Sequence, residues 1–120
     1  MGRRSRRRQG PGGAARNAGA TDYADAHGNV LTLRDHLSEG TLRELAELAA
    51  SPAASQEDRW QRRNEFLFER LAVSWTISGL PLKGQKELLG RYRMADAEMR
   101  RWVGETVEGH VRANEPDAAG

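Results

Sequence analysis

The chain has 120 residues, of which 38% are hydrophobic and 30% charged, so it can form one domain with a modest core but no elaborate active-site cleft. It contains no cysteine, which excludes disulfides, thiolate metal sites and thiol catalysis and makes a reducing cytoplasm the simplest compartment. The net charge of +2 combines six arginines and no acid in residues 1–20 with two arginines and eight acids in residues 21–58. The basic start favours a polyanion, or its own acidic stretch, as a partner.

Residues 1–20 are predicted to be a disordered basic arm, because they contain no aromatic or β-branched side chain that could be buried. Five arginines of the arm are candidate ligands for nucleic-acid phosphates: Arg3, Arg4, Arg6, Arg7 and Arg8. The alternative is a solubilising segment that reflects GC-rich codon usage or a misassigned start codon, since 17 of the 19 basic residues are arginine. Both interpretations stay open.

The stretch "TDYADAHGNVLTLRD" predicts a β-hairpin, with Tyr23 on one strand, Val30–Arg34 on the other and Gly28 in the turn. A calcium loop built on the same glycine is not predicted, because its first and twelfth ligand positions would fall on Tyr23 and Arg34. Two strands are marginal alone, so we expect the hairpin to pack on helices.

Four helices are predicted after the hairpin. Capping signals and apolar spacing place them at Thr41–Ala50, from Ser55 up to Gly79, at Leu82–Tyr92 and at Asp96–Arg112. We therefore predict a mainly α fold, a three to four helix bundle with a small N-terminal β-hairpin and a disordered Arg-rich arm. Residues 21–113 would form a single helical domain, and residues 114–120 a frayed tail. The longest uncharged run, residues 71–82, is too short to span a bilayer.

The stretch Lys86–Val103, "KELLGRYRMADAEMRRWV", resembles the helix-turn-helix of bacterial repressors. The resemblance implies that Arg100 and Arg101, on the second helix, contact DNA. The sequence departs from the motif at Leu89, where a small residue is usual, and at Arg93, where the turn glycine is usual.

The alternative for the same segment is a helix that only closes the core. In the helix-turn-helix arrangement Met94 would point inward and Gly104 would be exposed to solvent. The exposed face would be self-paired at helical spacing, through Glu98 with Arg101, Arg101 with Glu105, and Glu108 with Arg112.

Three stretches together, "DAHGNVLTLRD", "NEFLFERLAVSWTISGLPL" and "QKELLGRYRMADAEMRRWV", resemble a group of small actinobacterial proteins that carry no assigned activity. The resemblance covers about residues 22–111 and implies a shared fold unit without implying a chemistry.

We predict a non-enzymatic cytoplasmic binding protein that contacts a protein partner, or a second copy of itself, through its helical surface. The candidate contacts are Trp60, Phe66 and Phe68. The alternative is a protein that binds duplex DNA through the Arg-rich arm and a degenerate helix-turn-helix at residues 86–103. No catalytic residue, cofactor, metal, membrane or small-molecule substrate is predicted, because the sequence shows no phosphate-binding glycine loop, HExxH pair or activated nucleophile.

Overall fold

The computed structural model describes residues 14–17 and 19–114. The described strands and helices follow one another along the chain in the order β1 (Ala14–Asn17), β2 (Ala20–Ala24), β3 (Val30–Arg34), α1 (Glu39–Ala50), α2 (Gln56–Leu71), β4 (Ala72–Ile77), β5 (Leu80–Leu82), α3 (Gln85–Arg93) and α4 (Ala97–Asn114). None of the described helices is long and apolar enough to cross a membrane.

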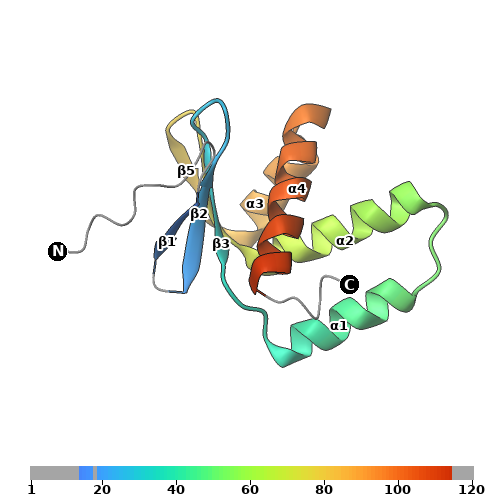
Figure 1. Cartoon of the computed structure of the whole chain (residues 1–120). Helices are drawn as coiled ribbons and strands as arrows, with labels where there is room; N and C mark the ends of the chain where they lie inside the picture. Colours follow the sequence, from blue (N-terminus) through green and yellow to red (C-terminus); the bar gives the residue numbers. More distant parts are fainter. Residues whose placement is uncertain (1–13, 18, 115–120) are drawn as a thin grey trace.

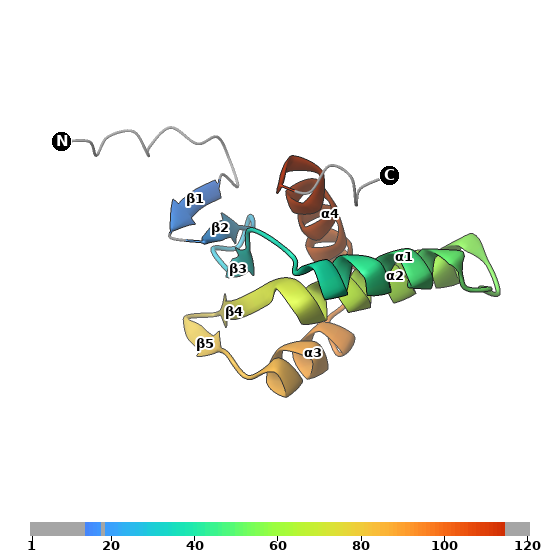
Figure 2. The ribbon, with the colours of Figure 1, turned by 90° about the horizontal axis from the view of Figure 1, so that it is seen from below.

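The five strands form one antiparallel sheet in the order β1-β2-β3-β4-β5 (Figure 1). The helices lie to one side of this sheet in both views, and α1 and α2 form an antiparallel pair that projects away from it (Figure 2). Helices α3 and α4 both contact α2, and α3 also contacts β4. Helix α2 is therefore central among the described helices.

The predicted mainly α bundle with a small hairpin is wrong, because the hairpin is part of a five-stranded sheet. The largest error is the second helix, which ends at Leu71 and is followed directly by β4. The segment "AVSWTI" is rich in β-branched and aromatic residues, which suit a half-buried strand. It pairs with β3, where Leu31 is opposite Trp75, and both side chains are fully buried. The helical domain proposed for residues 21–113 is thus a mixed α and β domain.

The strand pairing predicted within the hairpin is confirmed. Strands β2 and β3 pair with Tyr23 opposite Leu31, and Gly28 has a positive φ of 85° in the turn. The Asp25 carboxylate accepts hydrogen bonds from the backbone N–H groups of His27 and Asn29, which fixes the turn.

The predicted arm overlaps the sheet, because residues 14–17 form β1 and pair with β2. The five candidate arginines, Arg3, Arg4, Arg6, Arg7 and Arg8, lie outside the described residues. At the other end α4 extends to Asn114, and the rest of the predicted tail also lies outside them.

Local capping signals were mostly placed correctly. Ser55 Oγ accepts from the Asp58 N–H at 3.0 Å and begins α2, and Asp96 Oδ1 accepts from the Met99 N–H at 2.8 Å and begins α4. The first helix begins earlier than predicted, because Ser38 is its N-cap and accepts from the Thr41 N–H at 3.1 Å.

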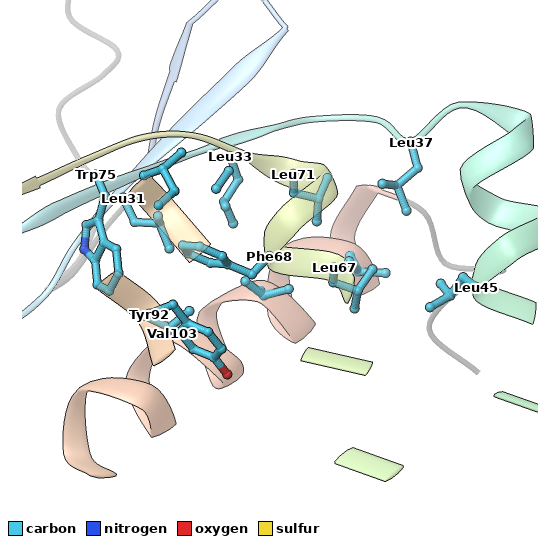
Figure 3. Close-up of a cluster of buried hydrophobic side chains, with 14 residues drawn as sticks. Leu31, Leu33, Leu37, Leu45, Leu67, Phe68, Leu71, Trp75, Tyr92 and Val103 are labelled. Atoms are coloured by element: carbon cyan, nitrogen blue, oxygen red, sulfur yellow. The ribbon is translucent and has the colours of Figure 1, made fainter. Parts of the chain in front are cut away.

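The core fills the space between the sheet and the helices (Figure 3). Phe68 of α2 lies in its centre, 5.6 Å from the Trp75 ring of β4 and stacked on Tyr92 of α3 at 4.9 Å between ring centroids. Leu33 from β3 and Val103 from α4 belong to the same buried cluster. This core holds α2, α3 and α4 together on one side of the sheet.

His110 fixes the end of α4 to the sheet. Its Nε2 lies 2.6 Å from the Arg34 carbonyl oxygen, so Nε2 carries a proton and donates. Its Nδ1 lies 2.7 Å from the Tyr23 hydroxyl. The His110 side chain is 1% exposed and joins α4 to β2 and β3.

Candidate interaction surface on helices α2 and α4

Helix α4 crosses α2 at Gly104, where the two helices approach very closely. A Cβ atom added at Gly104 would lie 2.9 Å from Asn64 Nδ2 and 2.9 Å from the edge of the Trp60 ring. Only glycine permits this approach without a shift of the neighbouring side chains. The crossing therefore lays the Trp60 ring against the backbone of α4.

Trp60 is 39% exposed and separates two hollows on this face of the molecule. The first, of about 250 Å³, lies between α2, α3 and the start of α4 and is lined by Glu57, Trp60, Gln61, Glu65, Tyr92, Arg93, Ala97, Arg100 and Arg101. The second, of about 420 Å³, is more open and is lined by Gln56, Glu57, Trp60, Arg101 and Glu105. We call the residues of both hollows the Trp60 surface.

Two arginines of the Trp60 surface, Arg100 and Arg101, form no ion pair with any described residue. The same holds for the carboxylates of Glu57 and Glu105. Arg93 differs, because its Nη2 lies 3.0 Å from Glu65 Oε1. The Trp60 surface therefore carries two positive and two negative charges that are available to a partner.

The ion pairs predicted along α4 do not form among the described residues. Glu108 pairs with Arg63 of α2 instead, with a distance of 2.6 Å between Arg63 Nε and Glu108 Oε2 and a second contact of 3.2 Å. This two-point contact connects the middle of α2 to α4 on the other side of the crossing. Arg101 and Glu105 are both exposed to solvent and form no ion pair with each other.

Burial raises the pKa of the Tyr92 hydroxyl above its usual value, and the neighbouring Glu65 carboxylate adds to the rise while Arg100 opposes it. Tyr92 is therefore neutral at physiological pH and supplies a hydrogen-bonding group to the wall of the first hollow. The hydrogen bond to Glu65 raises the pKa of Arg93, which keeps that guanidinium fully charged.

Asn64 lies beneath this surface at 1% exposure, and neither its amide nitrogen nor its amide oxygen has a hydrogen-bond partner in the described structure. An unsatisfied buried polar group costs about 1–3 kcal/mol of folding free energy. The crossing of α2 and α4 is thus a place where the fold is not optimised for stability.

The structure separates the three residues predicted as an interaction surface. Trp60 is partly exposed, Phe66 is half-buried with the Arg70 guanidinium 4.7 Å from its ring centroid, and Phe68 is fully buried. Phe68 therefore belongs to the core and not to a surface. Helix α2 has apolar residues on more than one side. The spacing between Trp60 and Phe68 therefore did not show which of the two side chains is exposed.

The structure instead brings Trp60 together with Arg100 and Arg101, which the sequence had assigned to different partners. Within the segment that resembles a helix-turn-helix and the residue that follows it, Gly104 is buried although it was expected to be exposed. Met94, expected to point inward, is 83% exposed in the turn between α3 and α4.

A further hollow of about 260 Å³ lies between α1 and α2 and has an apolar floor with Arg59, Arg62 and Arg63 at its edge. Arg59 Nη1 donates to the Ala49 carbonyl at 2.8 Å, and Arg62 Nη1 donates to the Pro52 carbonyl at 3.0 Å. Helix α1 has no basic residue in its last turn, so these contacts supply the positive charge that its C-terminal end favours. The first two arginines are accounted for by the end of α1.

In the described part of the chain, no group of three or more histidine, aspartate or glutamate side chains is arranged to hold a metal ion. No protein-family model matches the chain, and comparisons with curated proteins and with solved structures find no match.

Proposed function

We propose that this chain is a protein-binding module, without enzymatic activity, whose contact site is the Trp60 surface. The observation that carries the proposal is a partly exposed tryptophan between two hollows, next to two arginines that no described acid neutralises. Tryptophan, tyrosine and arginine are the residues that contribute most to protein interfaces, especially where a rim of other side chains excludes water around them. The cytoplasm is the compartment we propose, since a cysteine-free chain needs no oxidising environment.

The mixed charge of the surface favours a protein partner over a nucleic acid. Glu57, Glu65 and Glu105 line the same hollows as the arginines, and each carboxylate would face a phosphate of a bound duplex. A protein can offer both signs of charge, so it can pair with the arginines and the carboxylates together.

Paired affinity capture tests the proposal. The parent chain, Trp60→Ser and Leu80→Ser are used as baits in extract of the source cells, and captured proteins are quantified by mass spectrometry. Leu80 is the matched control, because it is 70% exposed but lies on β5, away from α2 and α4. We expect a partner that is captured by the parent and by the Leu80 variant and lost with the Trp60 variant. Equal capture by all three baits contradicts the assignment of this surface.

DNA binding is the second candidate, and one observation favours it: Arg100 and Arg101 are exposed in the first turns of α4, where a helix-turn-helix would present them. The test is fluorescence anisotropy of a labelled duplex with the full chain, with Arg100→Ala combined with Arg101→Ala, and with a chain that begins at Ala14. The truncation stops there because residues 14–17 pair with β2.

Binding through α4 requires the truncated chain to bind and the double variant to lose affinity. Binding that is lost only on truncation assigns the DNA contacts to the arm residues 1–13. A duplex that none of the three proteins binds removes this candidate.

A further inference from the structure

Glu57, Trp60 and Arg101 line both hollows of the Trp60 surface, so these three side chains form the ridge between them. Glu57 and Trp60 lie in the first two turns of α2, and Arg101 lies in the second turn of α4. A ridge with a hollow on each side fits a partner of the same shape, because the ridge of one molecule enters the hollow of the other.

The positive and negative side chains of the Trp60 surface on one copy can also pair with those of the same surface on a second copy. Two arginines, Arg100 and Arg101, and two glutamates, Glu57 and Glu105, form no ion pair with a described residue. The sum of these four charges is zero. A wholly acidic partner would leave the carboxylates opposed, and a wholly basic partner would leave the arginines opposed. In a two-fold interface every contact occurs twice with the roles exchanged, so one arginine–glutamate contact between two copies would neutralise two charges of each sign.

We propose that the partner of the Trp60 surface is a second copy of this chain, in a two-fold dimer that sets Arg101 of each copy against Glu57 of the other. The exposed face of the Trp60 ring in each copy contacts the other copy, while the edge of the ring stays against α4 of its own chain. The inference rests on the proposed function, because it names the partner of the same site.

The size of the face limits the area that a dimer can bury. The part of α2 in the Trp60 surface, residues 56–65, is about 15 Å long. Two neighbouring helices are about 20 Å across, so the face covers roughly 300 Å² on each copy and roughly 600 Å² in total. This is smaller than the standard specific interface, so we expect a weak dimer with a dissociation constant in the upper micromolar range.

The first measurement is sedimentation equilibrium of the full chain between about 1 and about 200 µM, a range that brackets a micromolar dissociation constant. We expect the average mass to rise from the monomer toward the dimer with concentration. A monomer mass over the whole range overturns the inference.

Charge exchange then tests the face. Arg101→Glu places two carboxylates against each other twice in a dimer, and Glu57→Arg does the same with two positive groups, so we expect each variant alone to be monomeric. Mixed in equal amounts, the two variants restore both opposite-charge contacts, and we expect them to associate as a heterodimer. If Arg101→Glu and Glu57→Arg each dimerise alone like the parent, the dimer uses another face and the inference fails. If each is monomeric and their mixture does not associate, Arg101 is not set against Glu57 and the inference fails as well.

The matched control is the exchange of Arg43→Glu and Glu47→Arg, two exposed residues on α1. These variants change the net charge by the same amounts, so each alone should dimerise like the parent. Circular dichroism melts of all four variants check that the fold is kept. If the parent is monomeric but capture by the Trp60 surface succeeds, the partner is a different protein, so the failure of the dimer is distinguished from failure of the proposed function.

Discussion

Gly104→Ala tests the closeness of the crossing between α2 and α4. The added Cβ would lie 2.9 Å from Asn64 Nδ2 and from two carbon atoms of the Trp60 ring, so a neighbouring side chain must move. Forcing a methyl group into a packed site costs about 1–3 kcal/mol. Because Trp60 is 39% exposed, its ring can swing outward, and we expect the lower part of this range. Alanine also stabilises a helix interior by about 1 kcal/mol relative to glycine, so the variant should be less stable than the parent by about 0–1 kcal/mol.

Gly109→Ala is the matched control, because it lies in the same helix and an added Cβ there meets no atom within 4 Å. It should raise the free energy of unfolding by about 1 kcal/mol through helix propensity alone. The two variants should therefore differ by about 1–2 kcal/mol in urea unfolding monitored by circular dichroism, with equal m values. If Gly104→Ala stabilises the chain as much as Gly109→Ala does, the two helices do not approach as closely as described.

The buried polar groups give three further predictions. Asn64→Leu has nearly the same shape and removes two unsatisfied amide atoms, so it should raise the free energy of urea unfolding by about 1–3 kcal/mol; a lower value would show that the amide finds a partner in solution. His110→Phe removes the hydrogen bonds of this side chain to the Arg34 carbonyl and the Tyr23 hydroxyl and should lower the stability by about 1–3 kcal/mol; a loss under about 0.5 kcal/mol in thermal melts would contradict this. The pKa of Tyr92 is raised from 10.0 in the fold, so the folded state resists its ionisation and stability is full below pH 10 and falls as the pH rises above it. Tyr92→Phe should reduce that fall in urea titrations, and an unchanged slope would refute it.

The helix starts were predictable because capping is local. Ser55 and Asp96 accept hydrogen bonds from N–H groups three residues away, and the signal needs no knowledge of the rest of the fold. Strand β4 was not predictable in this way. Leu67, Leu71 and Trp75 recur at intervals of four, which fits a helix, and only pairing with β3, about 40 residues earlier, decides that Trp75 belongs to a strand.

The candidate site was predictable in its residues but not in its arrangement. Trp60, Arg100 and Arg101 were each identified from the sequence, yet their meeting depends on where α4 crosses α2. Glu57 was missed and Glu105 was expected to pair with Arg101, because charged residues on helix surfaces are common and carry no signal of their own. Gly104 offered a signal, since a glycine inside an amphipathic helix lowers its stability and marks a place where another group approaches closely.

Three features that lower stability coincide at this crossing. Gly104 costs about 1 kcal/mol relative to alanine, the unsatisfied amide of Asn64 costs about 1–3 kcal/mol, and part of Trp60 faces solvent. Departures from local optimisation are expected where a surface serves binding, because shape at that place is worth more than stability. Gly104 supports the shape directly, since an added Cβ would push the Trp60 ring away from α4 and change both hollows. Gly104→Ala should therefore weaken dimerisation by about tenfold in sedimentation equilibrium, which corresponds to about 1.4 kcal/mol of association free energy, while Gly109→Ala leaves it unchanged. Equal association by the two variants would show that binding does not depend on the position of Trp60 and that the glycine does not serve the interface.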